Sequence, residues 1–210
     1  RVLAEFGVTR ISLGVQSFSA DLLATLEGGH REPEILVAIE SLRGRIDIIG
    51  LDLIFAVPGQ TLDDWMRTLS RAVELGPSHV STYGLTFEKG TAFWSRRERG
   101  FLRSADEELE RGMYEAAMDV LPARGLQQYE LSNFAGRGHA CRHNETYWLG
   151  LPYYGFGPGA ASYRNGVRRT NHRSVTTWIR RVLEGESGVQ LEEQLSAEDR
   201  GREAIWLGLR

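Results

Sequence analysis

The stretch "IDIIGLDLIFAVPGQTLDDW", residues 46–65, contains the pattern that decides the fold. Residues 46–57 form a nearly continuous apolar run, which is typical of a strand buried on both faces rather than of an edge strand with one wet face. The run ends at a Pro-Gly pair, and Thr61 followed by Asp64 predicts a capped helix start. We expect this helix to extend to about Leu75. A buried strand that leads directly into a helix predicts a strand–helix–strand unit.

Two further β-prone runs flank this unit, at residues 8–15 and 79–86. The strand starts at residues 8, 46 and 79 are separated by 38 and 33 residues, the length of a strand with its crossover helix. The sequence therefore predicts an α/β fold with a parallel sheet, either open or curled into a barrel. The inner face of the helix after the central strand is expected to carry Leu62, Trp65, Met66, Leu69 and Val73.

Caps and apolar stripes predict the remaining elements. A long helix is expected after a capping box of Ser104 and Glu107, and another strand within residues 125–135. Residues 136–166 are rich in Gly, Tyr, Trp, Pro and His, which indicates an irregular segment of the kind that is more often functional than idle. Three more helices are expected to be capped by Ser19, Ser174 and Ser196.

Composition and charge exclude several classes of function. Of the 210 residues, 41% are hydrophobic and 25% charged, which is typical of a soluble globular protein. A formal net charge of -3 gives no basic field to hold a phosphate backbone, so nucleic acid is not expected as a partner. No apolar run approaches the roughly 20 residues that span a bilayer. The single cysteine allows no internal disulfide, which agrees with a cytoplasmic location.

Polar side chains follow the predicted strands at their carboxyl ends, where ligands of parallel sheets bind. They predict a site for a polar small molecule, and the alternative is that each one caps a helix or a turn. These residues are Gln16, Ser17, Thr86, Glu88, Glu130, Ser132 and Asn133.

Asp52 differs from these residues because it lies within the central strand. A carboxylate among apolar neighbours needs a hydrogen bond or an ion pair. Asp52 either pairs with an arginine such as Arg10 or faces the ammonium or hydroxyl groups of a ligand.

The stretch "RGHACRHNETYW" contains the only cysteine, Cys141. A zinc site of His139, Cys141 and His143 lacks a fourth ligand at a recognisable spacing, and a nucleophilic Cys141 lacks an oxyanion motif. A third interpretation is a pocket for a flat aromatic ligand, with Tyr147 and Trp148 for stacking and His143 as an axial ligand to a metal in it. The remaining alternative is a core loop whose polar side chains are satisfied.

The glycine-rich "GFGPGAAS", residues 155–162, does not favour a phosphate site. It has neither the Lys-Ser/Thr pair of a P-loop nor a GxGxxG pattern directly after a strand. Its glycines allow the backbone to approach a large ligand or another strand closely.

Seven motifs follow one another in an order and spacing that resemble a known family. They are "GVTRISLGVQSF", "LDLIFAVPGQT", "HVSTYGLTFEKGT", "QYELSNFA", "HNETYW", "GFGPGAAS" and "RRTN". Together they resemble the radical S-adenosylmethionine family of oxygen-independent coproporphyrinogen III oxidases, and within it the branch regarded as haem chaperones. The resemblance covers nearly the whole chain.

The resemblance implies a partial (β/α) barrel. Residues 1–166 match its C-terminal part, with irregular HNxxYW and GxGxxA loops, and residues 167–210 match the start of a small helical C-terminal domain. In the family the barrel holds S-adenosylmethionine and a 4Fe–4S cluster, the latter on a CxxxCxxC loop. This chain has no such loop, begins without Met and stops within the apolar "AIWLGLR". We therefore expect an internal fragment that binds no cluster alone, with the cluster cysteines upstream.

The resemblance also implies roles for single residues. The family usually has an arginine two residues before His30, where this chain has Gly28. An ion pair from that position to the cofactor carboxylate is therefore absent or supplied from elsewhere, such as Arg31. The residues that match contacts to S-adenosylmethionine are Gln16, Asp52, Thr86 and Ala161.

Two activities follow from the resemblance. The oxidase branch uses a cofactor radical to convert propionates of a porphyrinogen to vinyl groups, whereas the chaperone branch binds haem and delivers it to acceptor proteins. A non-catalytic homologue is a third alternative because of Gly28, and membrane association of the complete protein stays open. The HNxxYW pattern is more typical of the chaperone branch. It implies a haem-iron ligand in His143 and haem contacts from His143, Asn144, Tyr147 and Trp148.

Overall fold

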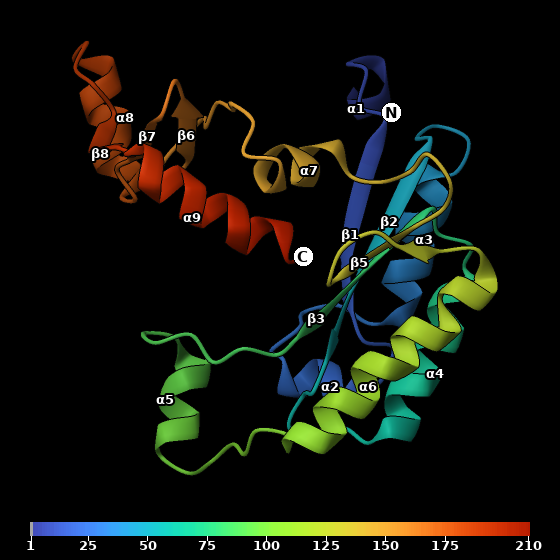
Figure 1. Ribbon diagram of the computed structural model, residues 1–210. Coiled ribbons are helices and arrows are strands. Elements are labelled where there is room, and N and C mark those ends of the chain that lie inside the picture. The colour runs from blue at the N-terminus through green and yellow to red at the C-terminus, as the bar shows by residue number, and fades with distance from the viewer. Residues whose placement is uncertain (1) are drawn as a thin grey trace. The chain divides into compact units, whose positions relative to one another are not determined.

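The computed structural model describes residues 2–210, which form two compact units with a boundary between Ala140 and Cys141. The first unit contains the sheet that the sequence predicts, and the second contains a separate, smaller sheet (Figure 1). No helix within residues 2–210 is both long enough and apolar enough to cross a bilayer.

The first unit is built on a five-stranded sheet with the order β1-β2-β3-β5-β4. The three predicted strands pair in parallel, which confirms the expected α/β class. The fourth predicted strand is wrong as a single element, because residues 125–135 turn back on themselves and β5 runs antiparallel to β3. The strands are β1 (Arg10–Gln16), β2 (Ile48–Phe55), β3 (His79–Gly84), β4 (Gln127–Gln128) and β5 (Asn133–Ala135).

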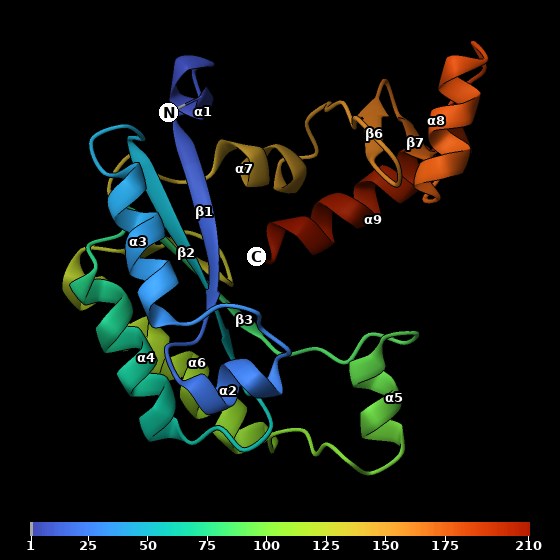
Figure 2. The ribbon, with the colours of Figure 1, turned by 180° about the vertical axis from the view of Figure 1, so that it is seen from behind.

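Helices of the first unit connect these strands and cover one face of the sheet, as α3, α4 and α6 do in Figure 2. The core between them joins strand residues such as Leu51 and Phe134 to Trp65 and Met113, all fully buried. The Trp65 indole N–H donates to the carbonyl of Met113 at 2.7 Å, which ties two helices together. The helices are α1 (Val2–Glu5), α2 (Ala20–Thr25), α3 (Glu32–Leu42), α4 (Leu62–Glu74), α5 (Ala92–Glu98), α6 (Glu107–Val120) and the short η1 (Pro122–Arg124).

The predicted start of α4 is confirmed. Thr61 Oγ1 accepts the N–H of Asp64 at 3.2 Å, and a carboxylate oxygen of Asp64 accepts the N–H of Thr61 at 2.9 Å. The same side-chain capping occurs at Ser19, Ser174 and Ser196, as expected. These caps depend on neighbours within three residues, so local sequence determines them.

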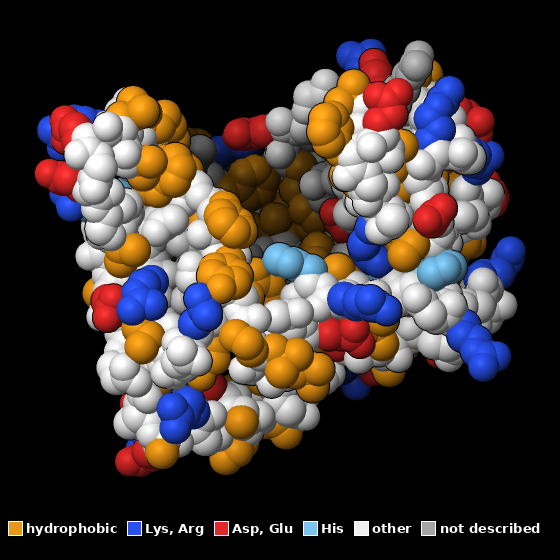
Figure 3. Space-filling view, turned by 90° about the horizontal axis from the view of Figure 1, so that it is seen from above, with side chains coloured by type: hydrophobic (Ala, Val, Ile, Leu, Met, Phe, Trp, Pro, Cys, Tyr) orange, Lys and Arg blue, Asp and Glu red, His pale blue; other side chains and the backbone are white. Residues whose placement is uncertain are grey.

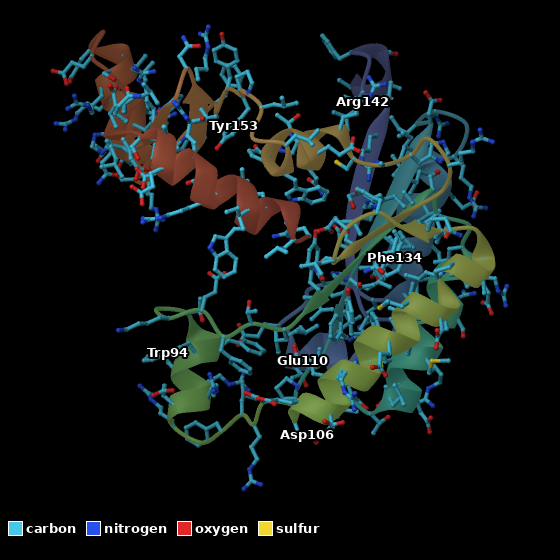
Figure 4. All side chains as sticks on the ribbon, in the orientation of Figure 1. Trp94, Asp106, Glu110, Phe134, Arg142 and Tyr153 are labelled. Atoms are coloured by element: carbon cyan, nitrogen blue, oxygen red, sulfur yellow. The ribbon has the colours of Figure 1, made fainter. Side chains whose placement is uncertain are left out.

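Two local predictions are corrected. On α4, Leu62 and Met66 are 41% and 38% exposed, because the buried stripe follows the spacing of Trp65, Thr68, Leu69 and Ala72 instead. The cap of α6 is Asp106, which accepts the N–H of Leu109 at 2.8 Å, and not the predicted Ser104. Asp106 directly precedes the first helical residue, so it occupies the position from which a side chain reaches the free N–H groups. Figure 4 labels Asp106 at the start of this helix.

The second unit combines helices with a three-stranded antiparallel sheet in the order β6-β7-β8. The predicted division at residues 166/167 lies in the hairpin between β6 and β7. The predicted irregular HNxxYW segment is helical, since it lies within α7, and β8 follows α8 where no strand was expected. The elements are α7 (Arg142–Trp148), β6 (Ala161–Arg164), β7 (Val167–Asn171), α8 (Val175–Leu183), β8 (Val189–Gln194) and α9 (Ala197–Gly208).

The glycine-rich segment before β6 approaches a strand closely, one of the two possibilities that its glycines allow. A Cβ at Gly155 would overlap the carbonyl group of Ala161. The N–H of Gly155 also donates to Ser162 Oγ at 2.9 Å. The glycine therefore lets this segment lie directly against β6.

Candidate functional site

The face of the sheet opposite the helices is polar. Strand neighbours in register point to the same side, and Gly14, Asp52, Ser81 and Asn133 are paired in one row across β1, β2, β3 and β5. The residues that alternate with them, such as Leu51 and the Phe134 labelled in Figure 4, pack into the core. We call this surface the polar sheet face, and its further members are Ser12, Gly50 and His79.

Asp52 lies in the middle of this row and is half-buried. Its carboxylate accepts a hydrogen bond from Ser12 Oγ at 2.7 Å. The alternative partner, Arg10, instead donates to the carbonyl of His139 at 2.9 Å. A carboxylate has about four lone-pair sites, so one hydroxyl leaves Asp52 with acceptor capacity for a ligand.

Gln16 ends β1 beside an irregularity in the pairing with β2. Its φ of 62° lies in the left-handed region, which is strained for a residue with a side chain. Its amide nitrogen is 3.0 Å from the position that a Cβ of Gly14 would occupy, so the side chain folds back over Gly14. Ala56, directly after β2, has a φ of 59°. Such outliers gather at ligand sites, and both lie at the carboxyl ends of adjacent parallel strands.

The other predicted strand-end residues divide into two groups. Thr86 follows β3 and is exposed at the same edge of the sheet. Ser17 is buried and accepts the N–H of Ser19 at 3.1 Å, so it serves the local turn. Glu130 likewise accepts hydrogen bonds from the N–H of Ser132 at 2.9 Å and from the amide of Asn133. The turn-capping alternative therefore holds for Ser17 and Glu130.

His79 is a residue of this face that the sequence did not single out. Its side chain is 2% exposed, and Nε2 lies 2.8 Å from the hydroxyl of Tyr129. Burial, together with the positive charge of Arg10, lowers the pKa of His79 to about 3. Within the described residues neither Nδ1 of His79 nor Oδ1 of Asn133 has a hydrogen-bond partner. Buried polar atoms of this kind call for a ligand or water partner.

The residues of this chain do not fit a 4Fe–4S cluster. Such a cluster needs several thiolates, and the sequence contains one cysteine, Cys141, at the start of α7. Within residues 2–210 no three His, Cys, Asp or Glu side chains are arranged so that they could hold a metal ion, and His139, Cys141 and His143 are no exception.

The second unit contains a cavity of about 980 Å³, which we call the aromatic pocket. Its size is at the upper end of the range for ligand pockets. Ring centroids form a continuous series from Tyr147 to Tyr153 at 4.4 Å and from Tyr153 to Tyr163 at 6.2 Å. Figure 4 labels Tyr153 in the segment before β6. Further lining residues include Trp148, Ala161, Arg168, Arg200, Glu203, Trp206 and Leu207.

Only two of the four HNxxYW residues line the aromatic pocket. Tyr147 and Trp148 line the aromatic pocket, whereas His143 and Asn144 are not among its lining residues. The exposed ring of His143 contacts that of Tyr147 edge-on, with centroids 4.9 Å apart. Ala161 lines this pocket and is not part of the polar sheet face.

The aromatic pocket contains charges of both signs. Arg168 donates to both carboxylate oxygens of Glu203, at 2.7 and 2.8 Å, and lies 3.4 Å from Glu193. These contacts, the Glu203 hydrogen bonds foremost, raise the pKa of the Arg168 guanidinium.

Trp206 on α9 is 76% exposed, and large hydrophobic side chains are exposed elsewhere too, as the space-filling view in Figure 3 shows.

Comparisons with known proteins agree with this geometry. The profile of the Radical SAM superfamily matches residues 1–72. The heme chaperone HemW of Bacillus subtilis is 36% identical over the whole chain, which covers 56% of that protein. HemW of Lactococcus lactis is 38% identical, again over the whole chain and 55% of that protein. The structure of coproporphyrinogen III oxidase (HemN) from Escherichia coli shares the fold, with a TM-score of 0.83 at 19% identity over 99% of this chain and 50% of that one.

The chain therefore belongs to the radical S-adenosylmethionine superfamily, whose members use S-adenosylmethionine and a 4Fe–4S cluster. It spans about half the length of the curated relatives that it matches. Over its whole length it is similar to proteins named heme chaperone HemW, and it shares its fold with a coproporphyrinogen III oxidase, in line with the resemblance.

Proposed function

We propose that the protein carrying this chain is a cytoplasmic haem chaperone, which binds haem as its cargo and passes it to acceptor proteins. The observation that carries the proposal is the aromatic pocket, lined by Tyr147 and Trp148 of the HNxxYW pattern. A large pocket with aromatic walls and a few charged groups suits a flat, mostly apolar ligand with polar edges. The HemW relatives are described as heme chaperones, which gives that ligand its class.

Within this proposal, Tyr147 and Trp148 offer ring surfaces to the haem macrocycle. His143 serves as a ligand to the haem iron, and Asn144 lies beside it. The His143 ring contacts the Tyr147 ring, so a haem against Tyr147 has the imidazole close by. Neutral imidazole is a common axial ligand of haem iron.

The polar sheet face is proposed to hold S-adenosylmethionine, which supplies radical chemistry in this superfamily. Its ammonium and hydroxyl groups need acceptors, and Asp52 has free acceptor capacity there. Gln16 and Thr86 lie at the carboxyl edge of the same sheet. Gly14 and Gly50 add no side chain to this face, which leaves room beside Asp52. A Cβ at Gly50 would lie 2.9 Å from Ser12 Oγ. No cluster is assigned to residues of this chain.

A haem titration tests the proposed function. We expect the chain to bind haem with saturable 1:1 stoichiometry and a shifted Soret band. His143→Ala should alter the band by removing the iron ligand, and Tyr147→Ala should weaken affinity by removing a stacking surface. Absence of saturable binding would refute the haem assignment. A cluster-loaded full-length protein that converts coproporphyrinogen III to protoporphyrinogen, without binding haem, would replace it with the oxidase alternative.

A further inference from the structure

One side of α9 forms the wall of the aromatic pocket. Arg200, Glu203, Ala204 and Leu207 all line the cavity, and their spacing of three, four and seven residues places them on one helix face. This wall is polar toward the start of α9 and apolar toward its end. A ligand with one charged edge and an apolar body therefore has a defined orientation along it.

The two arginines that line this pocket differ in their ion pairs. The Arg168 guanidinium is engaged by Glu203 and Glu193. Arg200 makes no ion pair or side-chain hydrogen bond with any residue of the described range 2–210. Arg200 is exposed, so its positive charge is available to an anion from solution.

The Arg200 guanidinium lies beside the hairpin between β6 and β7. One guanidinium nitrogen lies 2.7 Å from where a Cβ of Gly166 would be, so the glycine lets the guanidinium lie close to the hairpin. Gly166 has a φ of 77°, and its carbonyl accepts the N–H of Leu195 at 2.8 Å and the amide of Gln194 at 3.3 Å. The hairpin is thus fixed by hydrogen bonds, and the guanidinium rests on its backbone.

We propose that Arg200 recognises a carboxylate of the cargo, so that the aromatic pocket selects tetrapyrroles with free propionates. This inference rests on the proposed function. The macrocycle lies against Tyr147, Trp148 and the apolar end of α9, and a propionate reaches the guanidinium at the polar end. An arginine fork binds a carboxylate through two parallel hydrogen bonds, which gives direction as well as affinity.

Arg168 does not take this role. Its hydrogen bonds go to both oxygens of Glu203, so a propionate at Arg168 would first have to displace a carboxylate of the protein. Arg200 has no such competitor among the described residues. The pair of Arg168 and Glu203 acts instead as a neutral part of the wall.

The test compares haem with haem dimethyl ester, in which both propionate charges are removed. Each is titrated into the wild-type chain and into Arg200→Gln. The matched control is Arg202→Gln, an exposed arginine on the same helix that pairs with Glu198. The wild type should prefer haem over the diester by about tenfold or more, the usual effect of a charge-assisted hydrogen bond. Arg200→Gln should lose this preference through weaker haem binding alone, and Arg202→Gln should keep it.

The outcomes separate the two levels of the proposal. Equal affinity of the wild type for haem and diester overturns the role of Arg200, and this result needs no variant to fold. An equal loss of both ligands in Arg200→Gln also overturns it, because the arginine would then be a packing residue. Binding of neither ligand by the wild type refutes the proposed function itself. Arg200→Lys should restore part of the preference, since it returns the charge without the fork.

Discussion

Acid is expected to destabilise the first unit through His79. This imidazole is 2% exposed at the start of β3, and its pKa is lowered to about 3 by burial and by the charge of Arg10. An unfolded histidine has a pKa of about 6.5, so below that pH the unfolded chain binds a proton that the folded chain does not. The stabilisation is present above about pH 6.5, declines as the pH falls, and is lost near pH 3.

The size of the effect follows from the two pKa values. The whole interval from 6.5 to about 3 corresponds to about 5 kcal/mol in the free energy of unfolding. Between pH 7 and pH 4.5, where the folded form takes up almost no proton, the loss is about 2.5 kcal/mol. Because domains are stable by only about 5–15 kcal/mol, this is a large part of the total.

Urea unfolding of the wild type and of His79→Gln measures this loss. The glutamine keeps a polar group for the Tyr129 hydroxyl but cannot titrate. Whatever the substitution costs at pH 7, the free-energy difference between the two proteins should shift by about 2.5 kcal/mol in favour of the variant at pH 4.5. Between pH 7 and 8.5 it should change by less than about 0.3 kcal/mol, which is the internal control. The same difference at pH 7 and 4.5 would refute the link between His79 and acid stability.

Three further substitutions test other parts of the structure. Asp52→Ala should weaken S-adenosylmethionine binding to the cluster-loaded full-length protein by more than about 1 kcal/mol in equilibrium dialysis. Ser12→Ala, which removes only the hydroxyl that donates to Asp52, should weaken this binding by less. Unchanged affinity of Asp52→Ala would leave Asp52 a structural role. Gly155→Ala should lower the stability of the second unit in calorimetry by about 1–3 kcal/mol, because the added Cβ overlaps a carbonyl of β6. The control, Gly201→Ala on α9, has open space and should be neutral or stabilising. Equal effects of the two substitutions would contradict this. Thr61→Ala should cost about 1 kcal/mol in urea unfolding through the lost cap, and no loss would show that the cap is dispensable.

The sequence predicts most elements that depend on neighbours along the chain. The apolar run of β2 and the cap at Thr61 are local signals, and the structure contains both. The pairing of β5 against β3 could not be predicted, because Asn133 and Ser81 meet only through the fold. The buried state of His79 has the same origin, since its partner Tyr129 lies 50 residues away.

The candidate sites also combine residues that local sequence predicts with residues that only the fold brings together. Gln16 and Asp52 were predicted from their places at a strand end and within a buried strand, and their strand register now places them near one another on one sheet. The helical form of HNxxYW was missed because its Gly-rich surroundings suggested a loop. Arg200 and Trp206 were also missed. The spacing of the α9 residues can be seen in the sequence. The rest of the pocket comes from β6 and α7, which meet α9 only in the fold.

The strand order β1-β2-β3-β5-β4 leaves β1 at one edge of the sheet. Its sequence, "RISLGVQ", contains neither proline nor lysine, the residues that most often block the addition of another strand. The outward N–H and C=O groups of β1 before Val15 can therefore pair with a strand of another chain, whereas the Val15 carbonyl already accepts the N–H of Ser17 at 2.7 Å and lies 3.1 Å from Nε2 of His30. For the 210-residue chain in concentrated solution, self-association through this edge is the expected hazard. A lysine at an outward-facing position of β1 is the simplest way to keep such preparations monodisperse.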